Sequence, residues 1–342
     1  MWRLDNKTEF PVKSMFYTDK AGISHWVIVC KISWDMNSEI IKLADEQQAI
    51  RFIDEYIDND FSQAVNYGND LTPLKNKTDI IIKGHAYLPF SEGNYFDISL
   101  SFGIIEKVLR IRKERYLMKT LMGTRIVEGD FPEKISLGYE NAFGGKYKTD
   151  KEERIFSYNP AGKGYTNIKL VGSEKVYLPL LEYPEAPYNN RKGEIPPAAL
   201  GYISPFWETR RIYAGTYDQK WLDDKYPFYP DDFSNQFWQQ AAEDQQYPGE
   251  IYGNEKLRLT NMTKGGNHIN TLPENRELYP FEIKSIIKGK SSNHKYKINT
   301  LLIEPDDMTI STVYAAEMAY DPDMDDDIIV TINQLLDESK RC

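Results

Sequence analysis

Metal binding and nucleophilic catalysis are the first chemistries to test, because histidine and cysteine serve both. The chain has four histidines, none of them within chelating distance of another along the sequence: His25, His85, His268 and His294. The two cysteines form no C-x-x-C pair, so a zinc site would need ligands from remote segments. Cys30 lies in an apolar run, where burial makes a thiol a poor nucleophile. The sequence therefore predicts structural or surface histidines, no metal site and no cofactor.

Paired carboxylates offer a second chemistry. Asp218 with Asp223 or Asp224 could supply the acid and the base of glycoside hydrolysis, while neighbouring tyrosines and tryptophans stack on the sugar. A chain with 52 acidic residues contains such pairs by chance. A carbohydrate-active hydrolase is therefore an alternative, and the favoured prediction is a protein without enzymatic activity.

Two further segments match ligand-binding loops only in part. Asn159–Gly164 has the glycines and one lysine of a phosphate loop, but no Ser or Thr follows the lysine and no helical pattern comes after it. Asp321–Asp327 has the aspartates of a calcium loop, but Asp326 stands where the sharp turn requires glycine. We expect a turn in the first segment and a solvated acidic loop in the second.

The composition restricts the classes of partner. The chain carries 42 Lys+Arg against 52 Asp+Glu, a net charge of −10, which argues against nucleic acid as the main partner. Its longest uncharged stretch, Ile195–Trp207, contains three prolines and is shorter than the roughly 18 apolar residues of a membrane-spanning helix. The first residues are polar and acidic where a signal peptide would have its apolar core. The low number of cysteines, two, is typical of a protein whose thiols stay reduced. We expect a cytoplasmic protein that binds no membrane.

The local pattern that must position these residues is an alternation of apolar and polar side chains, which predicts antiparallel strands. It is cleanest at Phe96–Phe102. Further strands are expected at Trp26–Trp34, Asp79–Ala86, Leu109–Ile111, Ile135–Tyr139, Phe281–Ile283, Tyr296–Ile303, Thr309–Tyr314 and Ile328–Ile332. The turn residues Glu304–Asp307 predict a hairpin from about Lys295 to Tyr314. One short helix is expected at Asp231–Ala241, whereas Ser38–Ile57 is ambiguous, with a weak helical propensity.

The middle of the chain has a different composition. From Lys146 to Tyr229, Tyr, Pro, Gly and Asn are dense and the apolar periodicity is nearly lost. Disordered linkers are poor in aromatic residues, so we expect a long irregular segment packed on the sheets. The predicted fold is mainly β, with antiparallel sheets or a sandwich and one or few short helices. We expect one domain over residues 1–342, with a possible subdivision into 1–145 and 146–342.

Many short sequence words along the chain match one protein family in a fixed order. They are Leu43–Gln47, Asp70–Pro73, Lys75, Lys77–Asp79, Gly84–Tyr87, Tyr139–Gly145, Asn159–Gly164, Leu178–Pro179, Glu182, Pro184, Pro196–Ala198, Gly201, Trp207, Arg210–Arg211, Ala214–Asp218, Trp221, Pro227–Phe233, Asp244–Gln245 and Gly253–Glu255. On these words the chain resembles the bacterial family called domain of unknown function 2169, over roughly residues 10–320. The resemblance also implies an extended conformation for Ile40–Ile53.

The resemblance implies a function in type VI secretion. Members of the family are regarded as non-catalytic chaperones or adaptors, which help to load effectors with a PAAR domain onto the spike protein VgrG. A structural component of the spike or of a phage tail is a further alternative. An adaptor needs a broad surface with aromatic anchors, since Tyr and Trp supply contact area at low entropic cost.

The candidate partner-binding residues lie in or next to the aromatic-rich middle of the chain. They are Tyr158, Tyr165, Tyr188, Trp207, Arg210, Arg211, Tyr217, Asp218 and Trp221. We expect Trp207, Tyr217 and Trp221 to lie close together, with Trp221 in the core and Tyr217 partly exposed. The competing interpretation is that these residues only hold an all-β core together.

Overall fold

Strands make up most of the regular structure of the chain, as the alternating sequence pattern predicts. The computed structural model describes residues 2–89, 93–148, 153–166, 175–189, 194–322 and 327–335. The α-helices of these residues are all short: α1 (Glu208–Arg211), α2 (Gln219–Asp224) and α3 (Asn275–Leu278). The predicted mainly β fold is thus confirmed.

The central sheet is built around two long strands of twelve residues each, β3 (Ser24–Asp35) and β26 (Thr309–Tyr320). Its strand order is β2-β3-β26-β25-β7-β20, with β4 pairing on β3. The other strands are β2 (Val12–Thr18), β25 (Lys297–Glu304), β7 (Thr78–Ile82), β20 (Gln246–Tyr247) and β4 (Lys42–Leu43). β3 and β26 are buried on both faces, which explains their nearly continuous apolar runs.

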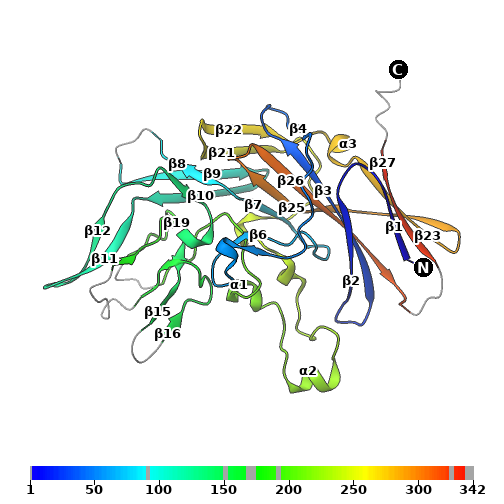
Figure 1. Ribbon diagram of the computed structural model, residues 1–342, viewed down its shortest axis with the longest axis horizontal. Helices are drawn as coiled ribbons and strands as arrows, with labels where there is room; N and C mark the ends of the chain where they lie inside the picture. The colour runs from blue at the N-terminus through cyan, green and yellow to red at the C-terminus, as the bar shows by residue number, and fades with distance from the viewer. Residues whose placement is uncertain are drawn as a thin grey trace.

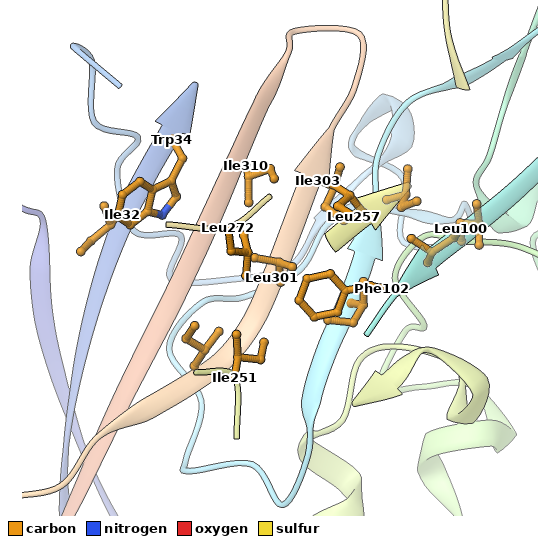
Figure 2. Packing of buried hydrophobic residues seen from close by; sticks show 14 of the residues in the cluster. Ile32, Trp34, Leu100, Phe102, Ile251, Leu257, Leu272, Leu301, Ile303 and Ile310 are labelled. Carbon is orange, nitrogen blue, oxygen red and sulfur yellow. The ribbon is translucent and has the colours of Figure 1, made fainter. Parts of the chain in front are cut away.

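A second, five-stranded sheet packs against one face of the central sheet. Its order is β19-β10-β9-β21-β22. The strands are β19 (Leu181–Glu182), β10 (Ile105–Arg112), β9 (Tyr95–Phe102), β21 (Lys256–Thr263) and β22 (Gly266–Thr271). Figure 2 shows Phe102 of β9 beside Leu301 of β25, within one large apolar cluster that also contains Leu100 and Ile303. The regular alternation of buried and less buried residues in β9 matches its sequence pattern.

Smaller sheets complete the molecule (Figure 1). A four-stranded sheet has the order β1-β27-β23-β24, and a three-stranded sheet has the order β12-β11-β18. Their strands are β1 (Trp2–Lys7), β27 (Ile328–Gln334), β23 (Phe281–Ile287), β24 (Lys290–His294), β12 (Gly123–Glu128), β11 (Arg115–Thr120) and β18 (Val176–Tyr177). The short pairs are β13 (Lys134–Ser136) with β8 (His85–Tyr87), β14 (Phe143–Gly144) with β17 (Lys163–Gly164), β15 (Lys146–Lys148) with β16 (Glu153–Ile155), and β5 (Glu55–Tyr56) with β6 (Val65–Tyr67).

Two local predictions are confirmed. β25 and β26 form the expected hairpin, with Glu304 opposite Thr309. The segment Ser38–Ile57 contains the two short strands β4 and β5 and no α-helix. This agrees with the extended conformation that the resemblance implies and differs from the weak helical propensity of the segment.

The expected helix at Asp231–Ala241 is wrong in length and type. The structure has a single 3-10 turn at Asn235–Trp238, whose first residues are capped by the side chain of Ser234. The turn ends because Gln239 and Gln240 are drawn to the buried carboxylate of Asp79, to which both donate hydrogen bonds. A contact across some 160 residues therefore overrides a local pattern.

Other expectations concern isolated residues. Cys30 is buried, as its apolar run predicts, and burial strongly raises the pKa of its thiol. Cys342 and most of the acidic loop Asp321–Asp327 lie outside the described residues. The segment Asn159–Gly164 is irregular apart from β17, and Asn159 is fully buried with its amide donating to the backbone oxygens of Tyr139 and Phe143.

Candidate functional site

Buried ion pairs tie the irregular middle segment to the sheets. Glu182 of β19 is fully buried and accepts hydrogen bonds from Arg112 Nε at 2.9 Å, from Arg115 Nη2 and from the backbone N–H of Tyr188 at 3.1 Å. Removing water from a carboxylate is costly unless it is paired in this way. Glu182 therefore fixes the chain around Leu181–Tyr188 against β10 and β11.

A second ion pair joins β10 to the segment before β20. Lys107 Nζ lies 2.8 Å from Asp244 Oδ1 and 2.9 Å from Gln245 Oε1, and Tyr183 donates its hydroxyl to Asp244 Oδ2. Burial lowers the pKa of Lys107, and the charge of Asp244 opposes that shift. The lysine, the aspartate and the tyrosine thus join three separate parts of the chain at one point.

A third ion pair, with both partners buried, includes Asp79 of strand β7 in the central sheet. Lys75 Nζ is 2.6 Å from Asp79 Oδ2, and both side chains are completely buried. Lys75 also donates to Gln240 Oε1 and Thr300 Oγ1. Burial lowers the pKa of Lys75, against the effect of Asp79. We call the residues of these three ion-pair groups the buried polar frame. Several of them belong to the sequence words that match the family, which gives these words a structural purpose.

Several candidate partner-binding residues are also buried. Trp207 is only 3% exposed and packs edge-to-face on Tyr139, with 5.4 Å between the ring centroids. Arg210 is buried and donates to the backbone oxygens of Ile203 and Phe237. Tyr188 is also buried, in a cluster with Phe143. Sequence reasoning could not foresee the burial of Arg210, because its carbonyl partners are set by the tertiary fold.

The remaining candidates outside α2 are more accessible. Tyr165 is partly buried and packs on Phe156 with 5.4 Å between ring centroids, and Tyr158 is about half exposed beside the same phenylalanine. Arg211 is exposed and forms an ion pair with Glu208 on α1. Tyr158 therefore belongs to an aromatic cluster around Phe156 in the loop after β16, and Arg211 presents an accessible charged group on α1.

Residues 216–232, called here the α2 projection, form a loop that extends away from the sheets (Figure 1). Hydrogen bonds at its base hold the two ends together, because Thr216 donates through both its N–H and its hydroxyl to the carboxylate of Asp232. These bonds lower the pKa of Asp232. Lys20, from the turn between β2 and β3, donates to the backbone oxygen of Phe233 at 3.0 Å. The projection thus starts from a fixed base.

Three of the candidate residues shape the tip of the α2 projection. Asp218 caps α2, since its Oδ1 accepts from the backbone N–H of Trp221 at 2.9 Å. The ring of Tyr217 packs edge-to-face on Trp221, with 4.7 Å between centroids. Trp221 Nε1 donates to the backbone oxygen of Phe228 at 2.8 Å, which closes the loop. Trp221 is half-buried by these contacts and lies outside the core, contrary to our expectation.

Exposed apolar side chains lie along the projection on either side of Trp221 in the sequence. We define the α2 patch as Tyr217, Trp221, Leu222, Tyr226 and Phe228. Tyr217 is 52% exposed, Leu222 50% and Tyr226 64%, and the ring of Tyr226 lies 5.7 Å from Trp221. Sequence reasoning missed Leu222, Tyr226 and Phe228. The sequence signal that could identify them is the density of apolar residues between aspartates, in a segment that lacks the apolar periodicity of a core strand or helix.

The structure brings Tyr217 and Trp221 together but leaves Trp207 in a separate cluster with Tyr139. Arg210 draws α1 inward through its buried hydrogen bonds, while the tie between Thr216 and Asp232 directs the following loop outward. A connection that is short in sequence thus links a core tryptophan to an exposed aromatic cluster.

The acidic residues of α2 lie on its accessible side. Asp218, Asp223 and Asp224 are all exposed, and Asp223 accepts a hydrogen bond from Gln219 Nε2. Over the residues that the structure describes, no group of three or more His, Cys, Asp and Glu side chains is arranged to hold a metal ion. Within the same residues, no helix has the length and apolar character needed to cross a bilayer.

Comparison with known proteins identifies one family. The model of a family described as an uncharacterized protein conserved in bacteria (DUF2169) matches residues 21–315. No curated protein and no solved structure matches the chain. The matched range contains both the buried polar frame and the whole α2 projection.

Proposed function

Because the chain belongs to the DUF2169 family, we propose that it is a non-catalytic adaptor or chaperone. In the cytoplasm it binds a type VI secretion effector that has a PAAR domain, and it helps to load that effector onto the VgrG spike. The α2 patch is its docking surface. The observation that carries the proposal is the cluster of exposed aromatic and aliphatic side chains on a loop extending from the sheets.

Exposure of this patch has no explanation within the fold. Single exposed apolar residues are ordinary, but clustered ones usually mark a site of interaction. Tyr and Trp are also the residue types that most often dominate the binding energy of protein interfaces. Three of the five residues in the α2 patch are of these types.

Hydrogen bonds at both the base and the tip of the projection support the same function. The capping of α2 by Asp218, the bond from Trp221 to the Phe228 carbonyl and the tie between Thr216 and Asp232 fix the loop before a partner arrives. A pre-organised surface loses less conformational entropy on binding, which leaves more of the contact energy as affinity. The buried ion pairs behind it serve the same purpose by holding the middle segment in place.

Co-purification tests the proposal. The chain is co-expressed with the PAAR-containing effector that the resemblance implies in a neighbouring gene, as wild type and as the double variant Tyr217→Ala/Tyr226→Ala. The control is Tyr177→Ala/Tyr252→Ala, because these two tyrosines are exposed to the same degree, 52% and 63%, on other parts of the surface. Adaptor function predicts that the effector is retained by wild type and control and lost from the α2 variant.

Two further measurements separate the alternatives. A carbohydrate-active hydrolase would release sugar from a glycan panel, and a structural spike component would leave the cell with the secretion apparatus. An adaptor stays behind and releases no sugar. Sugar release that depends on Asp218 would refute the non-catalytic role.

A further inference from the structure

The charge around the α2 patch indicates the chemistry of its partner. The α2 projection carries five aspartates against two lysines, a net charge of −3. One of the lysines is already paired, since Lys225 Nζ lies 2.6 Å from Asp231 Oδ1. Asp224 lies one helical turn after Trp221 on the same side of α2, so negative charge borders the apolar surface, and Asp223 is exposed on another side of the helix.

The aromatic rings add a second preference for positive charge. The faces of Trp and Tyr attract Lys and Arg through the ring quadrupole, and this attraction grows when water is excluded. Tyr217 and Tyr226 each pack edge-to-face on Trp221, at 4.7 Å and 5.7 Å between centroids. Because these contacts are edge to face, the three rings do not stack face to face on one another.

From this juxtaposition we infer that the α2 patch binds a basic amphipathic segment, in which apolar side chains share one helical face and Lys or Arg flank it. The inference rests on the proposed function, because it names the chemical class of the segment that the docking surface takes. The apolar side chains contact Leu222 and the rings, while the cations face Asp224 and the negative charge of the neighbouring aspartates. The overall charge of −10 adds long-range attraction for such a segment and repels acidic ones.

Two model peptides test this inference without knowledge of the natural partner. Both have about 18 residues, enough for a helix, with leucines at the same helical positions. The polar positions are all lysine in one peptide and all glutamate in the other. Titration of each labelled peptide with the full chain, read by fluorescence anisotropy, should give an affinity for the lysine peptide at least tenfold higher. An ionic strength of about 1 M, where the screening length is about 3 Å, should remove most of this difference.

Variants then locate the binding. Asp223→Asn/Asp224→Asn should weaken the lysine peptide roughly fivefold to tenfold, as expected for two exposed charges. The control is Glu274→Gln/Glu277→Gln, at the N-cap and within α3, which removes the same charge from another short helix and should leave the affinity unchanged. Tyr217→Ala/Tyr226→Ala should reduce the binding further. Thermal unfolding of each variant shows whether the fold is kept.

The outcomes are distinct. Equal affinity for the two peptides, or equal losses in the α2 and α3 charge variants, would overturn the inference. Binding of the lysine peptide at the α2 patch, without co-purification of the neighbouring effector, would support this partner class and refute the proposed function. Retention of the effector by Tyr217→Ala/Tyr226→Ala, with the lysine peptide unbound, would refute the α2 patch as the docking site.

Discussion

Replacing Tyr217 or Trp207 by alanine should affect stability very differently, although the two residues are only ten positions apart. Trp207 is 3% exposed, and truncating a buried tryptophan typically costs about 3–5 kcal/mol. Tyr217 is 52% exposed and its main contact is the ring of Trp221, so its loss should cost about 1 kcal/mol, the scale of one aromatic pair.

These free energies convert into melting temperatures. A chain of 342 residues has an unfolding entropy of roughly 0.7 kcal/mol/K, from about 2.1 cal/mol/K per residue. Trp207→Ala should therefore melt about 4–7 °C below wild type, and Tyr217→Ala about 1–2 °C below. Circular dichroism melts measure both values, with Tyr177→Ala as the matched control for Tyr217. A Tyr217 variant that melts as low as the Trp207 variant would mean that the α2 patch is scaffold.

The remaining predictions concern the buried frame, a titrating histidine and a second exposed turn. Glu182→Ala leaves two arginines without their carboxylate, so urea unfolding should show a free energy of unfolding lower by about 3–5 kcal/mol. The control is Glu282→Ala, which removes a partly exposed glutamate of β23 and should be nearly neutral. Burial lowers the pKa of His294 below its usual 6.5, so the unfolded chain binds the proton more readily and stability falls as the pH drops below about 6.5. His294→Asn should remove that part of the pH dependence, and an unchanged profile would contradict it. Leu121→Ser/Met122→Ser, at the fully exposed tip of the β11–β12 hairpin, should shift the melting temperature by less than about 1 °C.

Much of the fold follows from the sequence because strand patterns are local. The alternation in β9 identifies its buried face directly, and the turn Glu304–Asp307 fixes the hairpin of β25 and β26. The 3-10 turn at Asn235–Trp238 could not be foreseen, since it ends where Gln239 and Gln240 reach Asp79, far away in the sequence. Local patterns carry no information about such distant polar partners.

The candidate site was predicted in part for a similar reason. Aromatic density drew attention to Tyr217 and Trp221, which contact each other on the α2 projection. The same density also selected Trp207, which is buried, because composition does not distinguish a core aromatic from an exposed one. Tyr226 was overlooked although it is the most exposed member of the α2 patch. Its exposure depends on how the projection leaves the sheets, which only the tertiary structure reveals.

The affinity of the purified chain for the proposed partner, a PAAR-containing effector from a neighbouring gene, tests the central claim most directly. Isothermal titration with wild type, Tyr217→Ala/Tyr226→Ala and the exposure-matched Tyr177→Ala/Tyr252→Ala gives the comparison. If the α2 patch is the docking surface, the first variant should bind at least about 30-fold more weakly, the equivalent of about 2 kcal/mol at a binding hot spot, while the second binds like wild type. Equal affinity of all three proteins for the effector would contradict the account.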